Sequence, residues 1–208
     1  MLGTHDLPLF AATVLVLNAT PGVDMALAIA STLRGGWRQG VAAAVGIMAG
    51  CVVHTLAAAF GLAALLATSA EAFAVVKYVG AAYLLYVAWG MAKAGLRPAA
   101  AADVAAPQSL WRTVRQGFFT NALNPKVALF FLALLPQFID ADAPDKTLAF
   151  LFLGAWFIVQ GLLFMLVLVA AVAPLRRTAP RPWVGRTLNL GGAGLFTLLA
   201  AKLAVTKP

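Results

Sequence analysis

Six stretches of the chain are each long and apolar enough to cross a lipid bilayer as a helix, and this feature restricts the fold most. A membrane-spanning helix needs about 20 mostly apolar residues. Of the 208 residues, 62% are hydrophobic and 11% are charged, which leaves too few polar side chains to cover a water-facing surface. We therefore expect an all-α membrane protein with six transmembrane helices, at residues 7–30, 41–67, 72–91, 117–139, 148–173 and 184–205.

The basic residues gather in alternate loops of this topology. The side reached after the first, third and fifth spans carries ten of them, whereas the opposite side carries three and most of the carboxylates. Because basic loops stay in the cytoplasm, both termini are predicted to be periplasmic. No basic cluster is interleaved with aromatic residues, so a nucleic-acid partner is not expected. The ten residues are Arg34, Arg38, Lys93, Arg97, Arg112, Arg115, Arg176, Arg177, Arg181 and Arg186.

An alanine- and proline-rich linker, residues 96–111, divides the chain into halves of three predicted spans, residues 1–95 and 112–208. Because three is odd, two related halves would lie upside down relative to each other, which is the inverted-repeat plan of many secondary transporters. The motif N-A-T-P-G from Asn18 matches N-A-L-N-P from Asn121 when one gap is allowed. We interpret residues 1–208 as one transmembrane transporter domain with a 3+3 inverted repeat.

Proline interrupts the first and the fourth predicted spans, at Pro21 and Pro125. Proline removes a backbone donor and clashes with the preceding turn, so it frees backbone groups at membrane depth. Such a break survives in a bilayer only where protein or a wet cavity surrounds it. Both prolines lie about 21 Å along a helix from the predicted outer boundary. Discontinuous helices at matching positions of two halves indicate where a transporter binds its substrate.

Charged and amide side chains flank both breaks. We hypothesise that they bind a small zwitterion, with its carboxylate toward Lys126 or a helix N-terminus and its ammonium toward Asp24 or free carbonyls. The alternative is structural, with Asp24 as a cap or ion-pair partner and Lys126 reaching toward the membrane surface. The predicted substrate-binding residues are Asn18, Pro21, Gly22, Asp24, Asn121, Asn124, Pro125 and Lys126.

His54 lies near the middle of the second span, on the face that carries Gly46 and Gly50. Glycines four residues apart permit close helix approach, so this face is predicted to lie against protein. His54 is either a proton relay or a structural histidine bonded to a carbonyl. The chain has no phosphate-binding loop, so we expect coupling to an ion gradient, with Asp24 and His54 as candidate proton carriers. No cofactor or metal site is predicted, because the other histidine, His5, is terminal.

Four motifs occur in order along the chain: P-G-V-D from Pro21, L-R-G-G from Leu33, the run from Lys77 to Tyr86, and the run from Gly117 to Lys126. Together they resemble the lysine exporter (LysE/RhtB) family of amino-acid efflux carriers. The resemblance implies a bacterial inner-membrane carrier that exports amino acids or related metabolites by proton antiport and is often a homodimer.

The family motifs fall on a subset of the same residues: Pro21, Gly22, Asp24, Asn121, Asn124, Pro125 and Lys126. Two positions depart from the family pattern. Val23 replaces a second proline, and Cys51 replaces an acidic or amide residue.

Two other functions remain open from the residues alone. The first is export of a metal cation or another small solute. The lack of a second His, Cys or carboxylate cluster within the predicted spans weighs against it. An intramembrane enzyme would require a nucleophile and a base, for which Cys51 and His54 are the available pair, but no orienting acid accompanies them. Tyr83 and Gln160 are further polar groups within spans, and hydrogen bonding between helices is the commoner role for such side chains.

Overall fold

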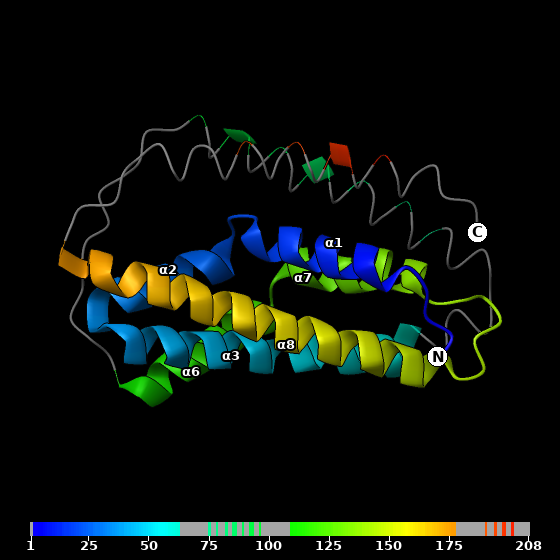
Figure 1. Cartoon of the computed structure of the whole chain (residues 1–208), viewed down its shortest axis with the longest axis horizontal. Helices are drawn as coiled ribbons and strands as arrows, with labels where there is room; N and C mark the ends of the chain where they lie inside the picture. Colours follow the sequence, from blue (N-terminus) through cyan, green and yellow to red (C-terminus); the bar gives the residue numbers. More distant parts are fainter. Residues whose placement is uncertain are drawn as a thin grey trace.

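The computed structural model describes residues 2–62 and 109–177 continuously, together with single positions between 75 and 96 and between 190 and 201. Within the two continuous ranges the chain is helical and forms no strand beyond an isolated bridge between Thr4 and Ile139. The expectation of an all-α chain is therefore confirmed for this part (Figure 1). The predicted third and sixth spans and most of the linker lie outside the continuously described residues.

Two of the described helices are long and apolar enough to cross a membrane without interruption. The helix α3, Trp37–Leu56, continues into the π-helix η1, Ala57–Leu62. The helix α8, Lys146–Val172, continues into the short 3-10 helix η4, Ala173–Arg177. They overlap the predicted spans 41–67 and 148–173, and each begins a few residues earlier than predicted.

Two further candidate spans are bent pairs of helices. The pair α1, Leu7–Ala19, and α2, Val23–Gly35, is bent by 57°. The helix α6, Leu110–Ala122, and the segment that follows it are bent by 47°. That segment comprises α7, Pro125–Leu129, then η2, Phe130–Leu134, and η3, Leu135–Phe138. The described residues thus hold two to four candidate membrane spans.

Both bends lie at the prolines. The helix α1 ends before Thr20, whose backbone is extended, and α2 begins after Gly22. Pro125 is the first residue of α7, where a helix has no use for the missing N–H. Each proline therefore separates two half-helices and does not merely kink a continuous one.

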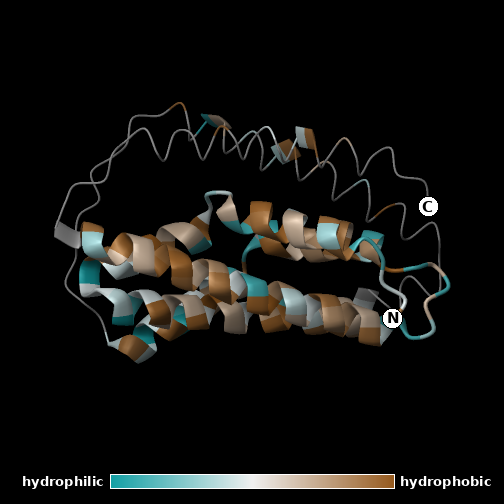
Figure 2. Cartoon of the chain, viewed as in Figure 1, coloured by the Kyte–Doolittle hydropathy of each residue, from teal (hydrophilic) through white to brown (hydrophobic). Residues whose placement is uncertain are grey.

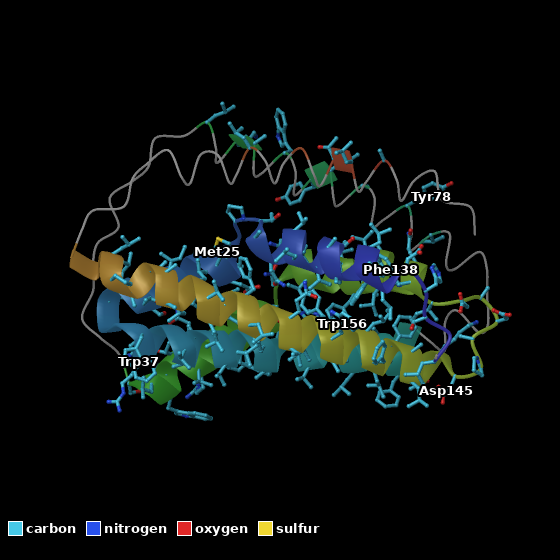
Figure 3. The ribbon with its side chains drawn as sticks, in the orientation of Figure 1. Met25, Trp37, Tyr78, Phe138, Asp145 and Trp156 are labelled. Carbon is cyan, nitrogen blue, oxygen red and sulfur yellow. The ribbon has the colours of Figure 1, made fainter. Side chains whose placement is uncertain are left out.

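The helices run between two ends of the molecule, and hydrophilic residues lie at both ends (Figures 1 and 2). At one end the N-terminal segment pairs with the loop after η3, where His5 N donates to the Phe138 carbonyl at 3.1 Å and Asp140 N donates to the Gly3 carbonyl at 2.8 Å. Asp145 and Trp37, labelled in Figure 3, mark opposite ends. The first end is acidic, because the N-terminal segment and the loop between η3 and α8 carry Asp6, Asp140, Asp142 and Asp145. The other end is basic, because the end of α2 and the starts of α3 and α6 carry Arg34, Arg38, Arg112 and Arg115.

The helices α3 and α6 pack against each other through glycine. An added Cβ at Gly46 would meet the carbonyl oxygen of Val114, one at Gly50 would lie 2.7 Å from that of Phe118, and one at Gly117 would lie 2.7 Å from that of Ala43. The glycine face of α3 thus lies directly on the backbone of α6. This contact positions the end of α6 beside the middle of α3, where the candidate site forms.

Candidate functional site

The two helix breaks lie against each other, and each carries a charge whose partners belong to the other break. Asp24, in the first turn of α2, accepts hydrogen bonds at Oδ2 from Nδ2 of Asn121 at 2.9 Å and from Nδ2 of Asn124 at 2.8 Å. Lys126, in α7, donates from Nζ to the carbonyls of Leu17 at 3.1 Å and Thr20 at 3.0 Å. Groups about a hundred residues apart in sequence thus form one polar cluster.

Asp24 is held in a buried, polar environment. Only 9% of the residue is exposed, and its position at the start of α2 places the carboxylate at the positive end of that helix. Its Oδ1 has no hydrogen-bond partner among the described residues, and the same is true of Asn121 Oδ1 and Asn18 Nδ2. Because buried polar atoms are nearly always satisfied, three such atoms around one point mark this cluster as the candidate site.

Lys126 lies at the broken end of α1. The last carbonyls of a helix lack intrahelical partners, and the negative end of the helix dipole attracts a cation. The ammonium satisfies two of these carbonyls, and a Cβ at Gly22 would lie 3.2 Å from Nζ. Lys126 therefore does not reach toward the membrane surface, which was the structural alternative for this residue.

His54 is buried and donates from Nε2 to the carbonyl of Asn121 at 2.9 Å. This is the geometry of the structural alternative, a histidine bonded to a neighbouring carbonyl. The same asparagine binds Asp24 through its amide, so Asn121 connects the histidine of α3 to the carboxylate of α2.

A small cavity of about 20 Å³ lies at the meeting point of the breaks. Since a water molecule needs at least about 10–15 Å³ measured in this way, the cavity has room for one water and not for an amino acid. Its polar wall comes from both breaks, and its apolar wall comes from α2, α3, α7 and α8. The polar lining residues are Asn18, Thr20, Asp24, Asn121 and Lys126, and the apolar ones include Met25, Ile47, Met48, Phe157 and Met165.

The structure brings together most of the residues predicted from the sequence. Asn18, Asp24, Asn121 and Lys126 line the cavity, Asn124 binds Asp24, and Gly22 lies beside the ammonium. Pro21 lies in the connection between α1 and α2, and Pro125 begins α7.

Sequence reasoning missed other members of the site. Thr20 contributes its carbonyl, for which its place just before a helix-breaking proline was the available signal. The methionines Met25 (labelled in Figure 3), Met48 and Met165 line the apolar wall, and no local pattern marks them. Cys51 also faces the cavity.

The other polar residues lie elsewhere. Gln160 donates to the Ala11 carbonyl at 2.7 Å and accepts from Trp156, also labelled in Figure 3, at 2.8 Å, so it joins α8 to α1. Tyr83 lies outside the described residues. Within the described part of the chain, no three His, Cys, Asp or Glu side chains are grouped as a metal site would require.

A bundle of apolar helices in which two broken spans share a buried polar cluster is typical of a membrane transporter. Residues 15–207 match the model of the LysE type translocator family, and the chain belongs to that family. It is 30% identical over 195 residues to the homoserine/homoserine lactone efflux protein of Salmonella typhimurium, covering 91% of each chain. It is 28% identical over 185 residues to the leucine efflux protein of Enterobacter sp., covering 88% of each. No solved structure matches the chain.

Proposed function

We propose that this chain is a secondary carrier that exports amino acids or related small zwitterionic metabolites across a bacterial inner membrane. The observation that carries the proposal is the reciprocal pairing of a buried carboxylate and a partly buried lysine across two broken helices, beside one cavity. A zwitterion presents the same two charges. Relatives named for efflux of homoserine and of leucine support the substrate class.

The proposed binding site consists of the two breaks and their flanking residues. Asp24 and Lys126 supply the charges, and the amides of Asn18, Asn121 and Asn124 supply donors and acceptors for the two ends of the amino acid. Pro21, Gly22 and Pro125 keep the backbone open at this depth. The partnerless atoms of Asn18, Asp24 and Asn121 support this assignment, because they are available to a ligand.

We propose that transport proceeds by alternating access. The cavity of about 20 Å³ is too small for an amino acid, so the carrier has to open before it binds one. The breaks are suited to act as hinges, because each connects two half-helices through a few non-helical residues.

We propose that proton antiport drives the export, with Asp24 or His54 as the proton carrier. A buried carboxylate with one partnerless oxygen supports Asp24. The link through Asn121 supports an involvement of His54, although its hydrogen bond to a carbonyl also fits a structural role.

Three observations support six spans in an inverted repeat. The helices α1 and α6 each have 13 residues, each ends in Asn-Ala, and each precedes a break. The chain leaves η1 at the acidic end and begins α6 at the basic end (Figure 1), which favours an odd number of crossings between them. The arginines at the basic end favour a cytoplasmic location for that end and periplasmic termini.

Uptake by proteoliposomes tests the proposal. Vesicles that contain the purified protein and a proton gradient are given labelled leucine or labelled homoserine. The wild type should accumulate label, and Asp24→Asn and Lys126→Ala should reduce uptake to the level of empty vesicles, because each removes one of the two charges.

The matched controls are Asp142→Asn and Lys146→Ala, which make the same changes at the acidic end of the molecule and should transport normally. All variants are compared at equal amounts of folded, monodisperse protein. Full uptake by both Asp24→Asn and Lys126→Ala would exclude the proposed site.

A further inference from the structure

The end of α1 forms a cation site in this structure. Nζ of Lys126 lies 3.1 Å from the carbonyl oxygen of Leu17 and 3.0 Å from that of Thr20. Both carbonyls belong to the broken end of a helix, where no further turn supplies backbone donors. Carbonyl groups at the C-terminal end of a half-helix are also the groups that coordinate cations in other transporters with broken helices.

The surroundings of this cation site suit an amino acid. Asp24, Asn18 and Asn121 line the same cavity and carry the partnerless atoms described above. Asp24 is 91% buried, since 9% of it is exposed, and Asn121 is 1% exposed. The cavity itself has room for about one water, so a second ammonium reaches the two carbonyls only when Lys126 withdraws.

We propose that the carbonyls of Leu17 and Thr20 are the subsite for the α-ammonium of the substrate, and that Lys126 fills this subsite while the carrier is empty. The inference rests on the proposed function and specifies which group binds where. One cation replaces another, so Asp24 keeps a compensating positive charge in both states. The displaced lysine is then free to pair with the substrate carboxylate.

The exchange also connects binding to opening. Lys126 belongs to α7, and its acceptors are Leu17 in α1 and Thr20 just after it, so its ammonium connects the two breaks in the empty carrier. Substrate binding removes this connection. A primary ammonium is therefore required of the substrate, both to occupy the carbonyls and to release the lysine.

The test uses an amine without a carboxylate, 3-methylbutylamine, and measures its affinity for the full-length protein in detergent at pH 7 by thermal stabilisation. In the wild type the amine competes with Lys126. In Lys126→Met the competitor is gone and Asp24 is left uncompensated, so the amine should bind at least about tenfold more tightly, as expected for a charge-assisted contact regained. The acid 4-methylpentanoate, which lacks the ammonium, should bind Lys126→Met no more tightly than the wild type.

The sign of the effect makes the test decisive, because a damaged protein binds more weakly and not more tightly. If Lys126→Met does not fold, Lys126→Gln takes its place and should also bind the amine more tightly than the wild type. Lys126→Arg keeps a cation and should not bind the amine more tightly. Lys146→Met is the matched control and should bind the amine as the wild type does. Unchanged or weaker amine binding by both neutral variants would overturn the inference.

Titrating the wild type with leucine and homoserine distinguishes failure of the proposed function from failure of the ammonium-subsite assignment alone. If neither amino acid stabilises the wild type, the proposed function fails. If they stabilise it and the amine binds the neutral variants no more tightly, only the assignment of the ammonium subsite fails.

Discussion

The two helix breaks resemble each other in sequence and differ in how their backbone is satisfied. At the α6–α7 break, Asn124 caps α7 by accepting from Lys126 N at 3.0 Å, and its own N–H donates to the Asn121 carbonyl at 2.8 Å. At the α1–α2 break, the capping residue Gly22 has no side chain, and two carbonyls depend on the ammonium of Lys126. The backbone groups at the α6–α7 break are thus satisfied by residues of that break, whereas those at the α1–α2 break are satisfied by Lys126 of the α6–α7 break.

The helices that precede the two breaks also differ in how firmly neighbouring helices hold them. The end of α6 lies on α3 through backbone contacts at glycine and through the bond from His54. The helix α1 is joined to α8 by side chains, through the hydrogen bond from Gln160 and the edge-to-face contact of Phe10 with Trp156. We infer that the α6–α7 break is the fixed reference and that the α1–α2 break is the part whose state depends on the ligand.

The largest expected effect comes from separating α3 and α6. In Gly46→Ala the new methyl group meets the Val114 carbonyl, so the helices have to move apart, and we expect a loss of about 3 kcal/mol in the free energy of unfolding. Gly61→Ala is the control, because nothing lies within 4 Å of its Cβ. Denaturant titration in detergent measures the free energy of unfolding of both variants. Equal values for Gly46→Ala and Gly61→Ala would contradict the fixed role of the α6–α7 break.

A smaller difference in the free energy of unfolding is expected between alanine variants of Asn121 and Asn18, which occupy matching positions before the two breaks. Asn121→Ala removes a hydrogen bond to a buried carboxylate and should cost about 2 kcal/mol. Asn18→Ala removes an amide nitrogen that has no partner among the described residues, and should change the free energy of unfolding by less than about 0.5 kcal/mol. The same titration measures both variants. Similar losses for the two would mean that the breaks are equivalent after all.

The smallest effect is expected at Gly22. Its backbone is extended, at φ −165° and ψ −177°, so alanine fits without strain. The new Cβ would lie 3.2 Å from the flexible end of Lys126, which can shift slightly. Thermal unfolding of Gly22→Ala should therefore differ from the wild type by less than about 0.5 kcal/mol, and a loss as large as that of Asn121→Ala would show that the first break is rigidly packed.

Much of the local structure was predictable from the sequence, because proline and hydropathy act over a few residues. Pro21 and Pro125 correctly located both breaks. The start of α6 was not located, since the helix begins at Leu110 and not near 117. Its first turns carry Arg112 and Arg115 on an exposed face, so their hydropathy is low although their helical pattern continues.

The members of the polar cluster could be predicted from the sequence, whereas the hydrogen bonds between them could not. The sequence indicated Asp24 and Lys126 as charges within the membrane, beside two helix breaks at equal depth. It did not indicate that Lys126 binds carbonyls at the end of α1, because a proline shows where carbonyls lose their helical partners but not which side chain reaches them. The pairing of Asp24 with Asn121 and Asn124 depends on how α6 lies against α3, which is fixed by tertiary packing.

The backbone pairing of the N-terminal segment with residues 138–140 has a mechanical consequence. It connects the N-terminal end of α1 to the C-terminal end of η3, while Lys126 connects the C-terminal end of α1 to α7. Between these two connections Phe10 packs against Phe130 and, edge to face, against Phe138. The helix α1 and the segment from α7 to η3 should therefore move together as one rigid unit that is connected at both ends. As long as both connections hold, and because α6 lies directly on the backbone of α3, α2 is the half-helix among the described residues that remains able to move, at the end of the molecule that carries Arg34.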